Sequence, residues 1–472
     1  MAMKKEKQEK LPKEVTSAAW AIAMAAIAPM LDTTMVNIGI NKLGLDFHTS
    51  LEIIQWVITG YVLALAVAVP VSGWLMDKFN GKKVLLNAEL GFILSSVLAG
   101  ISWNIESLIA FRLLQGVSAG IIIPLMTTLL MKVAGPDMLG RLMAVIGTPI
   151  ILGPLLGPVI GGFIIQLTSW RWIFFINIPF GLIALYLVSK RLDDFEPFNS
   201  DSKIDWVGII LLAIMSSSMI FGITRAAHFA SFHNHQTYWY VGIGLVTTIA
   251  YAIYNVKRNN KTVMPLNLFK HRSFSAAIIG MFLAGLATNG PMLLLPLFFQ
   301  NIRGFTLIEA SLAMIPQGVG MLIARPIIGK LIDRLGAKLV VIVSLTVSLV
   351  GSIPFIFIDE KTNFVLIAIV LVIRGIGVGG ITMPLMSDVY TGLQQEQIPQ
   401  ASIGSRIIQN VGSSFGSAAL ATVVATVVSG LKPTIPTILH GYQVGFLISV
   451  IVIGVMFIPA LFLTNKRKAT NN

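Results

Sequence analysis

The sequence predicts an all-α integral membrane protein with fourteen transmembrane helices, arranged as two six-helix bundles plus two inserted linker helices. Composition is the first observation: 55% of the 472 residues are apolar and 12% are charged, whereas soluble globular proteins carry roughly 25% charged residues. The second is a series of long apolar runs, and the third is a loop motif that occurs twice. A mean hydropathy of +0.82 excludes an ordinary soluble enzyme.

Fourteen apolar runs are long enough to cross a membrane. A hydrocarbon core about 30 Å thick needs roughly 20 residues of helix, and charges or clusters of Pro, Gly and Asn separate the runs. The runs cover residues 15–40, 51–76, 84–101, 107–131, 142–166, 170–189, 205–224, 237–256, 273–300, 306–329, 339–358, 363–387, 400–430 and 441–464. The first run follows a charged tail, is longer than a signal peptide and contains an acid, so we expect it to remain as a span.

Lys and Arg concentrate on one side of the predicted spans. An even number of spans places both termini on one side, where 24 of the 34 basic residues lie, against six in the opposite loops. Basic residues mark the cytoplasmic side, so the termini are predicted to be cytoplasmic in a multi-pass protein of the cell membrane. The net charge of +13 is therefore a topology signal. The bilayer is the expected partner, nucleic acid is not, and a monomer is expected.

Several function classes are excluded by what the sequence lacks. Because there is no cysteine, disulfides, thiolate nucleophiles and Cys-ligated metals are excluded, and no metal site is predicted. No predicted loop could form a soluble catalytic domain, and no GxxxxGK[ST] phosphate-binding loop occurs. The sequence therefore argues against ATP-driven pumping by this chain alone, and against a receptor or a membrane-embedded hydrolase.

One loop motif occurs twice. Residues 73–83 and 329–338 share Gly, Asp and Lys positions, and Asp77 and Asp333 are 256 positions apart. The copies end the second and tenth spans, which predicts two parallel six-span halves. The predicted division is a tail (1–14), a first bundle (15–189), a linker with spans seven and eight (190–272), a second bundle (273–464) and a tail (465–472). Such duplicated bundles bind substrate near the midplane and expose it to each side in turn.

Five motifs, in order along the predicted spans, resemble motifs of the major facilitator superfamily. Residues 73–83 resemble its loop motif, and RLLQG at 112–116 resembles its fourth-span arginine motif. Three others are similar to its fourteen-span drug:proton antiporter family: LDTTMVN at 31–37, the antiporter motif at 147–162, and WRWIFFINIP at 170–179. Asn80 stands where the loop motif usually has glycine, and the thirteenth span carries Arg406 without an acid. The resemblance implies the major facilitator fold.

Asp32 and Arg112 form the predicted proton-coupling pair. Asp32 lies about 14 to 17 residues into the first span, roughly 21 to 25 Å from the cytoplasmic face, which is too deep for its carboxylate to reach the headgroups. Arg112 enters the membrane from the other face and lies at a matching depth, about five residues into the fourth span. Since Arg keeps its proton, Asp32 is the member that titrates. The alternative is a permanent buried ion pair that holds two spans together.

Other polar residues inside the spans have more than one interpretation. Glu89, about five residues from the cytoplasmic end of the third span, is expected to reach the headgroups. The repeat offset relates Asp32 to Asn289, which either hydrogen-bonds substrate or packs between helices, and Arg374 either mirrors Arg112 or packs between helices. The predicted substrate cavity is lined by Asp32, Met35, Asn37, Trp56, Asn289, Met292 and Gln317.

Two motifs are predicted to control access. Glycines at every fourth position of the fifth span form a face for close packing, and prolines bend the helix. These antiporter-motif residues are Gly153, Pro154, Gly157, Pro158, Gly161 and Gly162. Ordinary helix packing is one interpretation, and the resemblance implies a seam against the other half that seals the outward leak. The predicted cytoplasmic gate comprises Gly73, Asp77, Lys78, Asp333 and Arg334. Solvated ion pairs between neighbouring residues, which contribute little, are one interpretation, and the resemblance implies instead that Asp77 pairs across the halves.

Together with the buried Asp32–Arg112 pair, the resemblance implies an antiporter, driven by the proton gradient and without a cofactor, that exports drugs or toxic compounds by alternating access. The expected substrates are small, amphipathic and cationic or zwitterionic. The alternative is an exporter of a specific endogenous lipid or metabolite, because the same motifs would serve it.

Overall fold

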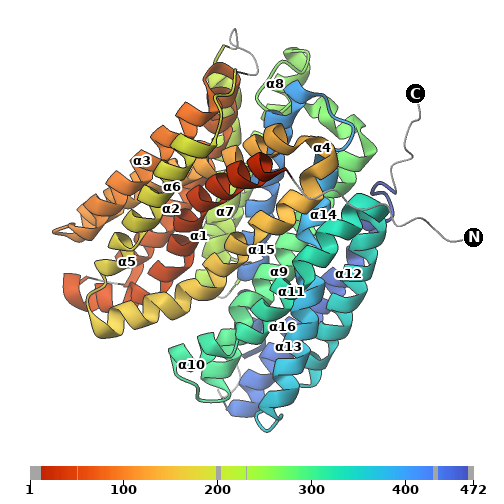
Figure 1. The fold of residues 1–472 in the computed structure, drawn as a ribbon. Helices are drawn as coiled ribbons and strands as arrows, with labels where there is room; N and C mark the ends of the chain where they lie inside the picture. The colour runs from red at the N-terminus through yellow and green to blue at the C-terminus, as the bar shows by residue number, and fades with distance from the viewer. Residues whose placement is uncertain (1–11, 50, 198–202, 230, 429–433, 466–472) are drawn as a thin grey trace, which may run out of the picture.

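The computed structural model describes residues 12–49, 51–197, 203–229, 231–428 and 434–465, and the regular secondary structure of these residues is helical throughout. Thirteen segments within them are long and apolar enough to cross a membrane. Figure 1 shows two groups of helices, α1 to α6 in red to yellow and α9 to α17 in green to blue. The prediction of an all-α membrane protein is confirmed.

The first group contains one helix that accounts for two predicted spans. Its elements are α1 (Lys13–Phe47), α2 (Leu51–Lys78), α3 (Gly81–Gly100), α4 (Ile105–Leu167), α5 (Trp172–Phe175) and α6 (Asn177–Arg191). The 63 residues of α4 would measure about 95 Å if straight, three times the thickness of the hydrocarbon core. Figure 1 shows instead an orange limb and a gold limb that meet at a bend. The limbs correspond to predicted spans 107–131 and 142–166, and the first of them is among the thirteen segments above.

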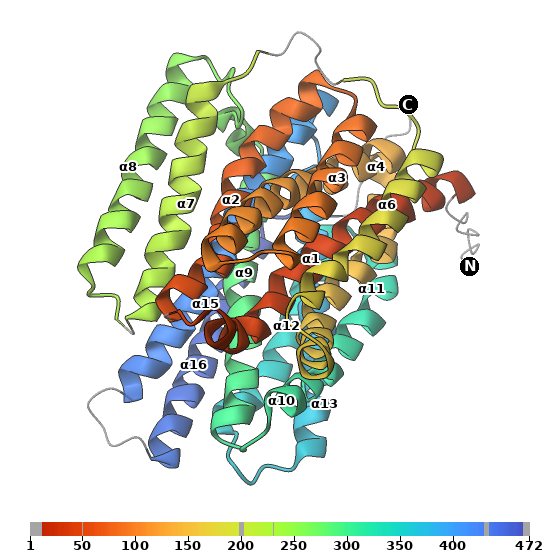
Figure 2. The same cartoon turned by 90° about the vertical axis from the view of Figure 1, so that its left-hand side faces the viewer.

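The inserted pair consists of α7 (Trp206–His228) and α8 (His235–Lys257). Figure 2 shows the two helices side by side at one edge of the molecule. α7 packs against α2 and against α15 (Ile398–Val428). Leu212 of α7 shares a hydrophobic cluster with Val69 of α2 and Ile407 of α15. The pair therefore covers one side of the junction between the two groups.

The second group is more segmented than the first. It contains η1 (Leu266–Lys270), α9 (Arg272–Asn301), α10 (Leu307–Leu312), α11 (Ile315–Leu335), α12 (Ala337–Ser352), η2 (Ile353–Phe357), α13 (Phe364–Gly379), α14 (Thr382–Val389), η3 (Gln395–Gln397), α15, α16 (Ile435–Val455) and α17 (Phe457–Ala460). The predicted span 363–387 is broken between α13 and α14, after Gly379 and Gly380. Glycine lowers helix stability, which explains a break at this point.

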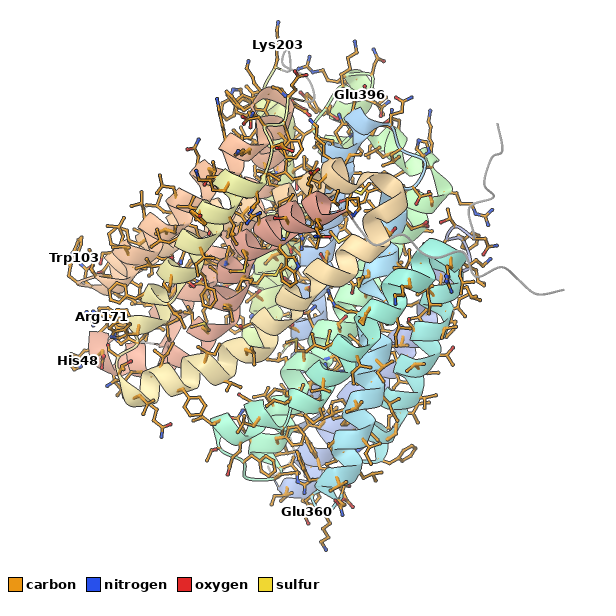
Figure 3. The ribbon with its side chains drawn as sticks, viewed as in Figure 1. His48, Trp103, Arg171, Lys203, Glu360 and Glu396 are labelled. Carbon is orange, nitrogen blue, oxygen red and sulfur yellow. The ribbon has the colours of Figure 1, made fainter. Side chains whose placement is uncertain are left out.

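The connections between helices alternate between the two ends of the molecule. Figure 3 labels Lys203 and Glu396 at one end, and His48, Trp103, Arg171 and Glu360 toward the other. The loops after an odd-numbered predicted span thus lie opposite the loops after an even-numbered span. This agrees with the alternation that the charge distribution requires.

The two copies of the repeated loop motif turn differently. Gly336 has a φ of 80°, in the left-handed region that favours glycine. Asn80, at the corresponding turn, has a φ of −58°, and its side-chain oxygen caps α3 by accepting a hydrogen bond from the Lys83 amide at 3.1 Å. The Asn80 amide also donates to Asp194 at 3.1 Å. The first copy therefore needs no glycine at this position.

Helix packing repeats across the two halves. Gly116 of α4 lies against the Tyr61 carbonyl of α2, and Gly375 of α13 lies against the Gln317 carbonyl of α11. One turn later, Gly120 contacts α2 and Gly379 contacts α11 in the same way. A Cβ atom at Gly116, Gly120 or Gly375 would collide with the neighbouring helix, and one at Gly379 would lie 3.0 Å from Met321. The internal repeat found in the sequence is therefore a repeat of helix–helix contacts.

Candidate functional site

Asp32 lies in the interior of the first bundle with no exposed surface. It sits one turn after Pro29, whose carbonyl accepts hydrogen bonds from the Thr33 hydroxyl at 2.8 Å and from the Tyr61 hydroxyl at 3.3 Å. Proline removes one hydrogen bond from the helix, and these two side chains hold the Pro29 carbonyl in place. α1 thus presents Asp32 to its neighbours from a well-anchored turn.

Arg112 contacts Asp32 directly, so the two residues predicted to lie at one depth do meet. Its Nη1 donates to Asp32 Oδ2 and to Gln115 Oε1, the latter at 2.6 Å, while its Nε donates to the Val57 carbonyl at 3.0 Å. The guanidinium lies over the Tyr61 ring, 4.0 Å from its centroid. Each of these contacts uses the planar fork of Arg, which Lys lacks.

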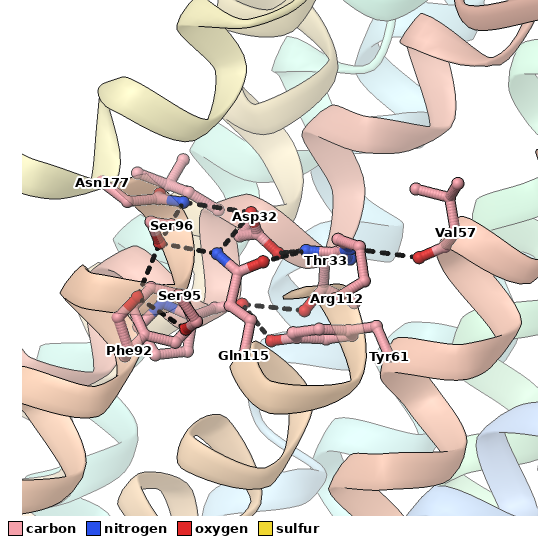
Figure 4. Close-up of polar contacts among 12 residues, drawn as sticks. Asp32, Thr33, Val57, Tyr61, Phe92, Ser95, Ser96, Arg112, Gln115 and Asn177 are labelled. Atoms are coloured by element: carbon pink, nitrogen blue, oxygen red, sulfur yellow. Dashed lines mark hydrogen bonds and ion pairs between the residues drawn. The ribbon is translucent and has the colours of Figure 1, made fainter. Parts of the chain in front are cut away.

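Two amide side chains complete the shell around the carboxylate (Figure 4). Gln115 and Asn177 donate to Asp32 Oδ1 at 3.3 and 3.0 Å. The same two amides donate to the Ser96 hydroxyl at 2.7 and 3.5 Å. Three donors therefore surround Asp32, the arrangement that suits an ionised carboxylate. We call Asp32, Arg112, Gln115, Asn177 and Ser96 the coupling cluster.

The coupling cluster joins four helices through one titratable group. Asp32 comes from α1, Ser96 from α3, Arg112 and Gln115 from α4, and Asn177 from the start of α6. The sequence motifs contained Gln115 and Asn177, but nothing in the sequence singled out Ser96. The sequence could have predicted that Gln115 lies beside Arg112, because it follows Arg112 by three residues and hence shares its helix face.

The second bundle has no acid at the corresponding place. Asn289 of α9 donates to the Ser413 hydroxyl at 3.0 Å and to the Gly285 carbonyl at 3.2 Å. Arg374 is buried and donates to Gln317 of α11 at 2.6 Å. Because α11 is the repeat counterpart of α2, this bond corresponds to the contact of Arg112 with α2 and not to its contact with Asp32. The side-chain oxygen of Gln317, a residue predicted to line the cavity, therefore accepts a hydrogen bond from Arg374.

A polar stripe on α15 leads from the first bundle to Asn289. Ser402, Arg406, Gln409 and Ser413 are spaced by three or four residues and share one helix face. At one end the Ser402 hydroxyl donates to the Pro124 carbonyl of α4 at 3.3 Å, and at the other end Ser413 accepts from Asn289. Arg406 donates to Gln409 at 3.0 Å. This stripe was not predicted as a unit.

The remaining cavity candidates do not join the coupling cluster. Met35 is fully buried in a hydrophobic cluster of the first bundle. Trp56 is 38% exposed and packs against Phe221 of α7, with ring centroids 5.8 Å apart. Met292 is partly buried on α9. The Asn37 side chain lies outside the described part of the structure.

Three of the antiporter-motif glycines pack against α1, as ordinary helix packing would predict. α4 also contacts α10 and α11 of the second half, so the seam that the resemblance implies stays a prediction. A Cβ atom at Gly153 would lie 2.9 Å from Met30, and one at Gly161 would lie 3.1 Å from the Met35 carbonyl. Gly157 lies against Thr34. The glycine face of α4 therefore packs closely against α1 both before and after Asp32. In this motif Gly162 faces the second bundle, near Ile308, and the side chains of Pro154 and Pro158 lie outside the described part.

At the predicted gate, the two halves meet through a close contact at a glycine, and no described ion pair connects them. Gly73 of α2 lies directly against Ile403 of α15. Asp77 is partly buried and makes no ion pair with any side chain that the structure describes, so the expected pairing across the halves is not seen. Lys78 and Arg334 are exposed, and the Asp333 side chain lies outside the described residues.

Glu89 differs from the expectation for a residue near a helix end. Its side chain is 1% exposed and does not reach the surface. Depth along α3 suggested that it could reach the headgroups, but the helix is rotated so that Glu89 faces α6.

Comparison with known proteins gives a consistent family. The family described as the Major Facilitator Superfamily matches residues 21–417. The "Multidrug resistance protein B homolog" of Mycobacterium tuberculosis (strain ATCC 25618 / H37Rv) is 31% identical over 403 residues, which cover 85% of this chain and 74% of the relative. The "Multidrug export protein EmrB" of Haemophilus influenzae is 30% identical, covering 84% of this chain and 78% of the relative.

A solved structure shares the fold at low identity. The crystal structure of a double-tryptophan XylE mutant superposes with a TM-score of 0.67 and 14% identity, covering 97% of each chain. At this identity the likeness concerns the arrangement of helices alone.

Proposed function

This chain belongs to the Major Facilitator Superfamily, and we propose that it is a proton-coupled antiporter that exports amphipathic compounds from the cytoplasm across the cell membrane. Its relatives are named as multidrug resistance and export proteins, so the chain is a multidrug efflux transporter of this superfamily rather than an enzyme. Proton coupling, the class of substrate and the cytoplasmic position of both termini are the parts that we propose.

The coupling cluster is the observation that carries the proposal. Protonation of Asp32 would remove the charge that three donors share, leaving Arg112 with the Val57 carbonyl and Gln115 as its acceptors. The amides of Gln115 and Asn177 would lose their common acceptor on α1. Because these groups belong to four helices, one proton would change the contacts among α1, α3, α4 and α6. A helix arrangement with two alternatives is what alternating access requires.

The transport cycle follows from this linkage. In the inward-open state, substrate binding favours deprotonated Asp32, and the proton leaves to the cytoplasm. In the outward-open state, protonation of Asp32 from outside favours substrate release and resets the carrier. Moving one proton inward supplies about 2.3 kcal/mol per 100 mV plus about 1.4 kcal/mol per pH unit. Together these sustain a substrate gradient of roughly a few hundred-fold.

Charge near the junction of the halves favours zwitterionic over simply cationic substrates. Asp32 is neutralised by Arg112 in the first bundle. In the second, the polar stripe of α15 contributes Arg406. A lone cation would be repelled by Arg406, whereas a zwitterion could place its anionic group there. We therefore propose amphipathic zwitterions as the preferred substrates, with cations transported less well.

Transport by the purified protein in proteoliposomes tests this proposal. A panel of amphipathic dyes should include the cation ethidium and the zwitterion rhodamine B, and a trapped pH indicator should follow protons. We expect an imposed pH gradient to drive dye movement and each transported dye to move protons in the opposite direction. Dye transport that ignores the pH gradient and moves no protons would contradict antiport.

A further inference from the structure

Glu89 is a buried acid that the coupling cluster does not use. It is 1% exposed, and neither carboxylate oxygen has a hydrogen-bond partner among the described residues. A charged side chain at the centre of a membrane helix costs about 2.5 to 3.5 kcal/mol on insertion scales, so buried acids in spans are usually functional. Because a protonated carboxyl avoids this cost, Glu89 has a reason to bind a proton in the state described.

Glu89 lies on the same helix–helix seam as the coupling cluster. It precedes Ser96 by seven residues on α3, which places both on one helix face about 10 Å apart along the axis. On α6, Gly181 follows Asn177 by four residues and shares its face. Asn177 faces Ser96 at one level, and at the next level a Cβ atom at Gly181 would lie 3.2 Å from Glu89 Oε1. The Ile93 side chain would lie closer still, at 2.5 Å, so the absence of a side chain at Gly181 leaves room for Ile93 and for the Glu89 carboxyl group.

The seam points toward the end of the bundle that is predicted to be cytoplasmic. Glu89 is eight residues from the start of α3 at Gly81, or about 12 Å along the axis. Ser96 and the coupling cluster are farther from that end. A proton that leaves Asp32 for the cytoplasm along this seam would therefore pass Glu89.

No described charged group compensates Glu89. α3 packs against α2, α4, α5 and α6, and no described residue of these elements forms an ion pair with Glu89. Among the described charged residues of these elements, Arg112 pairs with Asp32 and the others lie toward the helix ends. These others are Asp77 and Lys78 on α2, Glu106 and Lys132 on α4, Lys190 and Arg191 on α6, and Lys82 and Lys83 on α3 itself. The described residues of these elements therefore leave Glu89 free to exchange a proton rather than fixed in an ion pair.

We propose that Glu89 is a second proton-binding site, which relays the proton from Asp32 to the cytoplasm. The proton leaves the Asp32 carboxyl and passes along water in the opened seam to a Glu89 carboxylate oxygen. Asp32 becomes a carboxylate and Glu89 a carboxylic acid. Glu89 then gives the proton to cytoplasmic water and returns to its charged form. This inference rests on the proposed proton antiport.

Substitution of Glu89 tests the relay in the same proteoliposomes, with rhodamine B as the probe. Glu89→Gln should slow gradient-driven transport by about tenfold or more, the scale of a lost proton-transfer group, and flatten its dependence on internal pH. Dye binding should stay unchanged, and Glu89→Asp should recover part of the rate. Glu106→Gln removes an exposed acid from the same bundle and should behave as wild type.

The outcomes separate the relay from the antiport itself. Wild-type rate and pH dependence in a folded Glu89→Gln variant would overturn the relay while leaving antiport intact. Absence of proton movement in the wild type would overturn antiport. If the Glu89 variants fail to fold, infrared difference spectra of the wild type should show a carboxylic acid C=O band beyond that of Asp32 when the internal pH is changed. A single titrating acid would then contradict the relay.

Discussion

At the residue scale, the coupling cluster depends on geometry as well as charge. Arg112 uses separate nitrogens for the Val57 carbonyl and for Asp32, and it stacks on Tyr61. Asp32 in turn accepts from Gln115 and Asn177 as well as from Arg112. Asp32 is therefore held by contacts that a simple exchange of charges would not reproduce.

Arg112→Lys tests whether transport requires the planar guanidinium group of Arg112. Lys keeps the positive charge but cannot bond Val57 and Asp32 at once while stacking on Tyr61. We expect gradient-driven dye transport to fall by about tenfold or more, with normal insertion in the membrane. Arg191→Lys, at an exposed position of α6, is the matched control. Wild-type transport in Arg112→Lys would mean that charge alone suffices.

Arg406→Gln tests the preference for zwitterions. Removal of the only charge on the polar stripe of α15 should weaken transport of rhodamine B and strengthen that of ethidium, because the repulsion of cations is lost. The ratio of the two initial rates measures this effect independently of expression. An unchanged ratio would show that Arg406 does not face the substrate.

The sequence alone was sufficient to predict the central pair but not its surroundings. Depth along a span follows from counting residues, so Asp32 and Arg112 could be matched. Ser96 and Glu89 could not be assigned, because their partners depend on how each helix is rotated about its axis. Neutral polar residues and acids near helix ends occur for many reasons, and one sequence does not specify that rotation.

At the element scale, the gold limb of α4 holds α1 in place around Asp32. Gly153, Gly157 and Gly161 recur every four residues and lie against residues 30–35 of α1. The spacing of these glycines predicted a close-packed face, and hydropathy predicted the spans themselves. Neither pattern could identify the facing helix, and the resemblance suggested the other half. The partner is set by the tertiary arrangement.

Gly157→Ala should weaken the contact between α4 and α1. The added Cβ would collide with Thr34 Oγ1 and lie 3.2 Å from the Leu31 carbonyl, and crowding of this kind typically costs about 1 to 3 kcal/mol. Lower thermal stability in detergent and slower transport are expected. Gly242→Ala in α8 meets nothing within 4 Å and should be neutral or slightly stabilising. Equal thermal stability of the two variants would contradict close packing of Gly157 against α1.

At the scale of the whole molecule, the two halves touch near both ends. Gly73 of α2 meets Ile403 of α15 at the predicted cytoplasmic end, and Gly162 of α4 lies near Ile308 of α10 toward the other. Alternating access requires that these contacts open at different times. α7 packs on both α2 and α15, so the inserted pair bridges the junction that must move.

Cross-linking across the junction tests this movement. The chain has no cysteine, so Gly73→Cys with Ile403→Cys introduces the only thiols. A short reducible bis-thiosulfonate reagent should join α2 to α15 and stop transport, and reduction should restore it. Each single-cysteine variant treated in the same way is the control. Undiminished transport by the cross-linked protein would show that this contact stays closed throughout the cycle.

Proton coupling through Asp32 is the central claim, and Asp32→Asn tests it most directly. Asn resembles the protonated acid in shape and charge, so downhill exchange of rhodamine B between liposome and medium should continue. Substrate-dependent proton movement and accumulation against a gradient should both be lost. Asp46→Asn, at an exposed acid of the same helix, should retain both. Proton-coupled accumulation in Asp32→Asn at the wild-type rate would contradict the account.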